Sequence, residues 1–198
     1  MLFMSSGGYK IRDQYAVHFI SFAVVEWIDV FTRPVYQNIV LDSLKYCQGE
    51  RGLILNAWCL MSNHMHLVGS AKNGDLSGIL RDFKSVTSTQ IVQNIQANIH
   101  ESRRDWMLPV FRSAGKANSR NKNFQFWRQD NQPKECFSKS FTMQKINYIH
   151  ANPVVAGLVR RAEDYRLSSA IDFSPARQHG LLKVDVLLSN LKESESSS

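Results

Sequence analysis

The chain has 198 residues, of which 43% are hydrophobic and 21% are charged, a composition typical of one globular domain with a substantial core. It lacks the roughly 18 consecutive apolar residues of a membrane span and has no secretory signal pattern at its N-terminus, so we expect a cytoplasmic protein and no membrane partner. The formal net charge of +7 favours a polyanionic partner.

The first predicted elements are a strand and a helix. Residues His18 to Val30 are rich in β-branched and aromatic types, which indicates a long strand. Thr32 is a suitable N-cap, and Pro34 suits the first turn of the helix that follows. We expect this helix to end near Gly49.

A hairpin and a second helix follow. The segment Leu53 to Leu60 predicts a strand, Ser62 and Asn63 predict a turn, and His64 to Gly69 predicts the returning strand. Asp75 then caps a helix that runs towards Ile95.

The second half is less regular. Residues 97–122 show no steady period and predict a basic connection, for which mobility is one interpretation. A fourth strand is expected near 124–128 and a last helix over 140–151. We expect one domain over residues 1–180, and a C-terminal extension with a solvated tail over 181–198. The element order predicts an α+β fold: a ferredoxin-like antiparallel sheet of about four to five strands with helices on one face.

Basic and aromatic residues alternate between Glu101 and Arg128. Cations that follow phosphates and rings that stack on bases suit single-stranded nucleic acid, although a solvated basic loop beside core aromatics explains the same pattern. The candidate DNA-binding residues here are Arg103, Arg104, Arg112, Lys116, Arg120, Lys122 and Arg128.

Two histidines stand one residue apart in the third predicted strand. Successive strand side chains point to opposite faces, so His64 and His66 project from the same side and could share a metal ion. A bare pattern of this kind is more often two surface histidines. The three cysteines form no CxxC pair, which argues against a cysteine metal site.

The last predicted helix carries a tyrosine opposite its apolar stripe. Tyr148 and Asn152 are four residues apart, so they lie one turn from each other on the same face. Pro153 disfavours helical geometry at Asn152 and predicts that the helix ends there.

In combination, HMH at 64–66, YIHANPVVAGLV from Tyr148 and YRLSSA from Tyr165 resemble the single-tyrosine HUH transposases, and among them the REP-associated tyrosine transposases. The resemblance implies that Tyr148 is the nucleophile and that His64, His66 and Asn152 hold Mg²⁺ or Mn²⁺. Gln144 and His150 are alternative third ligands, and Lys145 is a candidate phosphate contact. It also implies nicking and rejoining of single-stranded DNA at hairpin-forming repeats through a 5′-phosphotyrosine, and it leaves open a homodimer formed at an exposed sheet edge.

Two other functions fit the same residues. One is a domesticated protein that binds structured palindromic repeats without cutting them. The other is a replication initiator or relaxase with the same chemistry, which the short chain disfavours.

Overall fold

A four-stranded antiparallel sheet is the centre of the fold. The computed structural model describes residues 11–118, 123–129, 133–175 and 179–186. The strands are β1 (His18–Ala23), β2 (Leu53–Leu60), β3 (His64–Ala71) and β4 (Lys134–Glu135), paired in the order β2-β3-β1-β4. Every pairing is antiparallel, which confirms the ferredoxin-like α+β fold.

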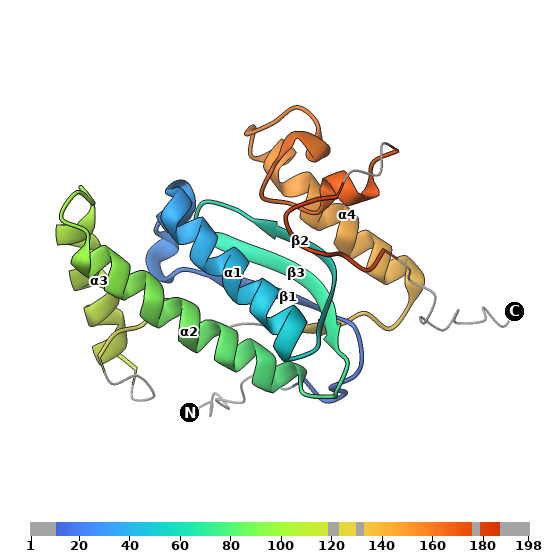
Figure 1. Ribbon diagram of the computed structural model, residues 1–198, viewed down its shortest axis with the longest axis horizontal. Helices are drawn as coiled ribbons and strands as arrows, with labels where there is room; N and C mark the ends of the chain where they lie inside the picture. Colours follow the sequence, from blue (N-terminus) through green and yellow to red (C-terminus); the bar gives the residue numbers. More distant parts are fainter. Residues whose placement is uncertain (1–10, 119–122, 130–132, 176–178, 187–198) are drawn as a thin grey trace, which may run out of the picture.

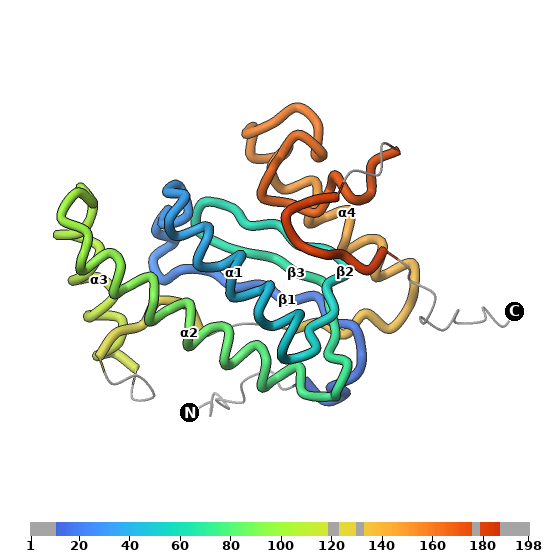
Figure 2. Tube along the Cα trace, in the orientation of Figure 1, coloured from blue at the N-terminus to red at the C-terminus, as the bar shows by residue number. Residues whose placement is uncertain are grey.

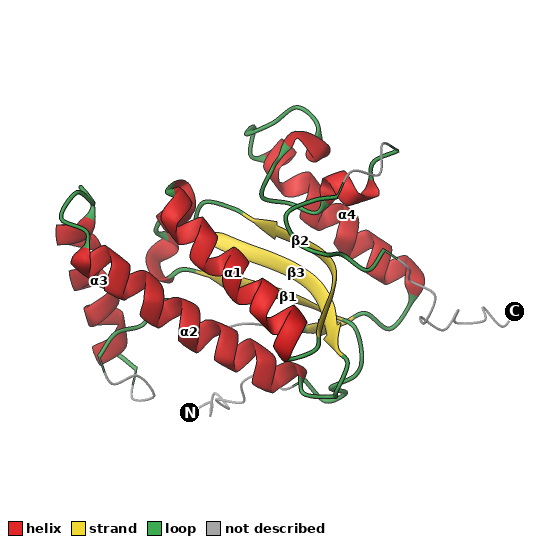
Figure 3. Ribbon diagram, in the orientation of Figure 1, coloured by secondary structure: helices red, strands yellow, loops and turns green. Residues whose placement is uncertain are grey.

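Four α-helices and short 3₁₀ turns complete the described residues (Figures 1 and 3). The α-helices are α1 (Pro34–Glu50), α2 (Leu76–Ala97), α3 (Arg104–Lys116) and α4 (Lys139–Val155). Among these residues, no helix is long and apolar enough to cross a membrane.

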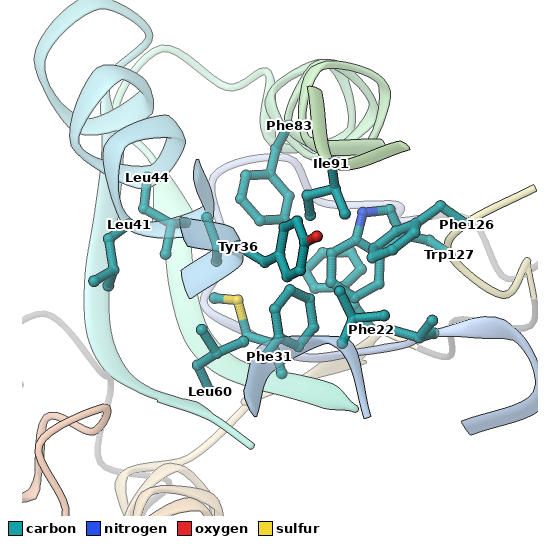
Figure 4. Close-up of a cluster of buried hydrophobic side chains, with 14 of the residues drawn as sticks. Phe22, Phe31, Tyr36, Leu41, Leu44, Leu60, Phe83, Ile91, Phe126 and Trp127 are labelled. Atoms are coloured by element: carbon teal, nitrogen blue, oxygen red, sulfur yellow. The ribbon is translucent and has the colours of Figure 1, made fainter. Parts of the chain in front are cut away.

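The larger core lies between the sheet and the pair α1 and α2, which run side by side over it in Figure 3. Its centre is aromatic: Phe22, Phe31, Phe83 and Trp127 are nearly or fully buried and their rings are in contact (Figure 4). Burying rings of this size contributes most of the apolar driving force for folding. This core fixes β1 and β3, the strands that present the histidine pair and its neighbours.

The opposite face of the sheet is covered by α4, so the expectation of helices on one face only was wrong. Ile146 and Ile149 of α4 are fully buried in a second, smaller cluster with Phe19, Cys59 and other residues of the strands. Each strand places alternate side chains on opposite faces, and here both faces carry apolar residues. A second covering helix is therefore required, and α4 supplies it.

A β-bulge in β2 shifts the strand alternation at Asn56, where the register skips between Leu55 and Ala57. Leu55 before the bulge and Trp58 after it therefore both join the larger core. The C-terminal segment docks at this point, because the Asp185 backbone N–H donates to the Leu55 carbonyl at 2.7 Å. Leu182 is buried there, and the predicted tail beyond Val186 lies outside the described residues.

Two predictions about the first elements need correction. The strand expected to reach Val30 ends at Ala23, because its partner β3 begins at His64, the residue paired with Ala23. Beyond Ala23 the chain turns through 3₁₀ geometry instead. Thr32 does not cap α1; its hydroxyl donates to the Asp29 carbonyl, and Pro34 begins the helix as predicted.

The region after α2 also differs from the prediction, because part of it is helical. Residues 104–116 form α3 within the predicted irregular connection, with Met107, Phe111 and other residues buried on one face. Its buried residues recur at helical spacing, but Pro109 lies in the interior of the helix, where proline normally disfavours helical structure. Residues 124–128 contribute only a single bridge, between Trp127 and Val24, because Phe126 and Trp127 both enter the core and break strand alternation.

The last helix runs further than predicted. α4 continues through Pro153 to Val155. Proline removes one backbone donor, but Pro153 lies in the last turn, where the Ala156 N–H still donates to the Asn152 carbonyl. Asn152 therefore stays helical, one turn after Tyr148.

Candidate active site

The two histidines of β3 lie together on the face covered by α4, as their spacing predicted. Their ring centroids are 4.9 Å apart. Phe19 of β1 stacks on His66 at 5.5 Å between centroids. Met65, between the histidines, points into the opposite core and is fully buried. The pair is therefore fixed by a strand at the centre of the sheet.

Asn63 fixes which nitrogen of His64 carries its proton. The Asn63 amide NH₂ donates to the Trp27 carbonyl at 3.1 Å and to Asp29 Oδ1 at 3.0 Å, both pure acceptors. Its oxygen must then be the atom 2.7 Å from His64 Nδ1. An amide oxygen only accepts, so Nδ1 bears the proton and Nε2 keeps its lone pair.

Ser21 forms the corresponding hydrogen bond with the second histidine, His66. Its Oγ lies 2.7 Å from His66 Nδ1 and comes from the neighbouring strand, where Ser21 pairs with His66. Both histidines thus use Nδ1 in a hydrogen bond within the protein, and Nε2 is the ring nitrogen that this bond leaves for another partner. A ligand histidine typically has its second nitrogen held in this way.

Burial keeps both imidazoles neutral near pH 7. Desolvation, reinforced by the charge of neighbouring His64, lowers the pKa of His66 to about 3. Desolvation also lowers the pKa of His64, while Asp29 acts in the opposite direction. Neutral imidazole is the form that binds a metal ion. The low pKa makes His66 a poor proton acceptor.

Helix α4 brings Tyr148 to the histidine pair. The Tyr148 ring lies 5.5 Å from that of His66 and 5.9 Å from that of Phe19. Its neighbour Ile149 is fully buried against the sheet, while Tyr148 is 50% exposed. A half-exposed aromatic ring that is held by two neighbouring rings can be reached by a large substrate.

The segment after α4 holds this helix against the sheet. The Ser169 Oγ lies 2.8 Å from His150 Nε2, and the Ser169 N–H donates to the Trp58 carbonyl. Tyr165 donates its hydroxyl hydrogen to the Leu60 carbonyl at 2.9 Å. Figure 2 shows this part of the chain returning beside α4. The YRLSSA motif is thus a clamp between α4 and the edge strand β2.

These contacts bear on the choice of third ligand. His150 is buried on the inner side of α4 with Ser169 and Phe173, so it does not join the pair. The Asn152 amide nitrogen donates to the Tyr148 carbonyl at 3.1 Å, so its amide oxygen is not used in this hydrogen bond. Gln144 is exposed, one turn before Tyr148. In the described part of the chain, no three His, Cys, Asp or Glu residues converge on one point.

Lys145 lies one turn before Tyr148 and is positioned by aromatic rings. Its Nζ lies 5.4 Å from the centroid of Phe19 and 4.9 Å from that of Phe141. Phe19 also contacts Tyr148, so the ammonium group lies on the same side of the sheet as the phenol. A cation there suits a phosphate near the tyrosine.

The predicted DNA-binding cations between Arg103 and Arg128 fall into four groups. The Arg103 side chain takes part in interactions within the protein, since its guanidinium pairs with buried Glu101 and donates to the Asp29 carbonyl. Arg104, Arg112 and Lys116 lie on α3, the last two exposed, and Arg128 lies 5.6 Å from the Trp27 ring centroid. Arg120 and Lys122 lie outside the described residues.

The ion pair of Glu101 gives a prediction about stability. Hydrogen bonds from Arg103 lower the pKa of Glu101 from 4.5 to about 2. A lowered carboxyl pKa stabilises the fold above pH 4.5, and this stabilisation is lost as pH falls from 4.5 towards 2. We expect Glu101→Gln to lower the free energy of unfolding at pH 7 by about 3 kcal/mol, and by clearly less at pH 3.

Urea denaturation at both pH values measures this difference. The control is Asp105→Asn, which changes a carboxylate with a 99% exposed side chain and is expected to have an effect below about 0.5 kcal/mol. An equal loss for Glu101→Gln at pH 7 and pH 3 would contradict the assignment of the stabilisation to the charged pair.

Trp27 is a neighbour of the site that the sequence did not reveal. It is 52% exposed, and its ring lies 5.7 Å from that of His64. Glu26 and Trp27 both have positive φ, at 52° and 53°. Such geometry costs an L-residue about 1–2 kcal/mol. No local sequence pattern predicts this geometry, because the Trp27 carbonyl is held by Asn63, which lies in the turn between β2 and β3.

Comparisons with known proteins show similarity in sequence and in fold. Residues 12–107, which include both histidines, match the family model described as "Transposase IS200 like". A solved structure, "Structure of the REP associates tyrosine transposase bound to a REP hairpin", matches with a TM-score of 0.61 and 15% identity over 96% of this chain and 99% of that one. No curated protein matches the chain significantly.

Proposed function

We propose that this protein nicks and rejoins single-stranded DNA at hairpin-forming repeats, because residues 12–107 match the IS200-like transposase model and the chain has the fold of a REP-associated tyrosine transposase. The observation that supports this most is the placement of Tyr148. It comes from outside the matched segment, and α4 sets its ring 5.5 Å from that of His66.

The proposed reaction is a transesterification at one phosphate. Tyr148 Oη attacks phosphorus as the phenol loses its proton, the bond from phosphorus to the 3′ oxygen breaks, and a 5′-phosphotyrosine and a free 3′-hydroxyl result. The ester bond is conserved in the intermediate, so a 3′-hydroxyl from another strand end can reverse the step without ATP. The half-exposed phenol and the adjacent Lys145 provide the nucleophile and a phosphate contact.

The residues fit a divalent metal ion. His64 and His66 would hold it through their Nε2 atoms, and Asn152 would add its amide oxygen, a hard neutral donor. When bound, such an ion polarises phosphate oxygens and offsets charge in the transition state. Mixed nitrogen and oxygen ligation is compatible with Mg²⁺ or Mn²⁺.

The direct test is formation of a covalent adduct. Wild-type protein is incubated with a labelled single-stranded hairpin oligonucleotide from repeats beside its own gene, with Mg²⁺ or Mn²⁺, and resolved on a denaturing gel. We expect a metal-dependent, SDS-resistant protein–DNA band. Binding without an adduct across several repeats would instead favour a domesticated DNA-binding protein.

Removing the group that sets the His64 tautomer should weaken the metal site. Asn63→Ala deletes the partner of His64 Nδ1 while leaving both histidines in place. Loss of such a partner typically lowers metal affinity about 10- to 100-fold. Calorimetric titration with Mn²⁺ measures this, and Asn147→Ala, an exposed asparagine of α4, is the control. Unchanged Mn²⁺ affinity in Asn63→Ala would refute the assigned role of Asn63.

A further inference from the structure

Resting on the proposed function, we propose that Trp27 is a stacking platform for an unpaired base next to the phosphate that Tyr148 attacks. The first observation is its position. The Trp27 ring makes an edge contact with His64 at 5.7 Å, and His64 in turn lies 4.9 Å from His66, the neighbour of Tyr148. An exposed indole thus lies beside the histidine pair that contacts Tyr148.

The second observation is that the protein holds this ring in place. Trp27 and the preceding Glu26 adopt left-handed backbone geometry, which a bulky residue rarely takes without a compensating constraint. Here the constraint is Asn63, whose amide group bonds the Trp27 carbonyl and also His64 Nδ1. One side chain therefore sets the position of both the indole and the first histidine.

The third observation is the chemistry around the ring. The Arg128 guanidinium lies 5.6 Å from the Trp27 ring centroid, so a cation accompanies the aromatic face. Trp27 also lines a surface groove with Trp106 and Arg103, and Trp106 is 49% exposed. Exposed rings in a groove suit unpaired bases, because every base presents a face for stacking. Glu26 and Asp29 also line this groove, and their acidic side chains do not attract phosphates. We therefore assign the attraction at Trp27 to stacking on a base.

The inference also specifies the substrate. A base can stack on an exposed indole only when it is unpaired, so the platform selects single-stranded DNA flanking a hairpin foot over the paired stem. Stacking is tolerant of base identity. Trp27 should therefore contribute affinity and placement of the strand, not sequence choice.

The test measures DNA affinity without cutting. Fluorescence anisotropy follows a labelled hairpin with single-stranded arms, in the Tyr148→Phe background and without added metal. We expect Trp27→Ala to bind about 10- to 100-fold more weakly and Trp27→Phe to bind within about threefold of the parent. The control is Tyr46→Ala, which removes a 60% exposed aromatic ring from α1, across the sheet, and should leave affinity unchanged.

An abasic site moved along the arms separates stacking from other contacts. At one position of the arm, removing the base should weaken binding to the protein that retains Trp27. At the same position, it should not weaken binding to Trp27→Ala any further, because a base and a ring that stack on each other lose the same interaction when either is removed. The proposal is overturned if Trp27→Ala binds like Tyr46→Ala, or if the two losses add in full at every position. Because this readout needs no cleavage, it stands apart from the adduct test.

Discussion

Tyr148→Phe is expected to abolish the covalent protein–DNA adduct and to lower the nicking rate at least about 1,000-fold, because the substitution removes only the attacking oxygen. The ring that contacts His66 and Phe19 is retained, and the deleted hydroxyl belongs to a half-exposed side chain. The fold and the affinity for the hairpin should therefore change little. Single-turnover nicking, the denaturing gel and an anisotropy titration measure the three quantities.

A second tyrosine provides the control. Tyr46→Phe removes the hydroxyl of an exposed tyrosine on α1 and should leave the adduct yield unchanged. An undiminished adduct in Tyr148→Phe would place the nucleophile elsewhere in the chain. Normal DNA affinity combined with loss of the adduct would assign Tyr148 to the chemical step.

Replacing both histidines with glutamine should remove metal binding and nicking together. Glutamine can still bond to Ser21 or Asn63 through its amide, but it lacks an imidazole Nε2 in the ligating position. We expect Mn²⁺ affinity and the metal-dependent nicking rate each to fall by more than about 100-fold. Removing a hydrogen-bond partner of a ligand lowers metal affinity by about 10- to 100-fold, and removing the ligands themselves should lower it further. Calorimetric titration and the adduct gel measure the two losses.

The matched control is His100→Gln, an exposed histidine beyond α2 that should have no effect on either quantity. Thermal unfolding of the double variant shows whether the fold persists. If His64→Gln with His66→Gln left nicking intact, the pair would be structural, and the chemistry would need another source of charge stabilisation.

Some features of the site follow from sequence because they are local. Strand alternation alone places His64 and His66 on one face, and helical periodicity alone places Tyr148 opposite Ile149. The structure confirms both arrangements. Local rules failed where tertiary contacts compete: β1 stops when its partner ends, and Pro153 is absorbed into the last turn of α4.

The α+β class, the hairpin with its histidine pair and the helix with its tyrosine could be predicted from local patterns, since each depends on the period of nearby residues. The position of α4 on the second face of the sheet, which brings Tyr148 to His66, depends on tertiary contacts. Tertiary contacts also decide that Arg103 serves an internal ion pair while Trp27 faces solvent beside His64. A charge or a ring takes its role from partners distant in the chain, and sequence spacing does not encode those contacts.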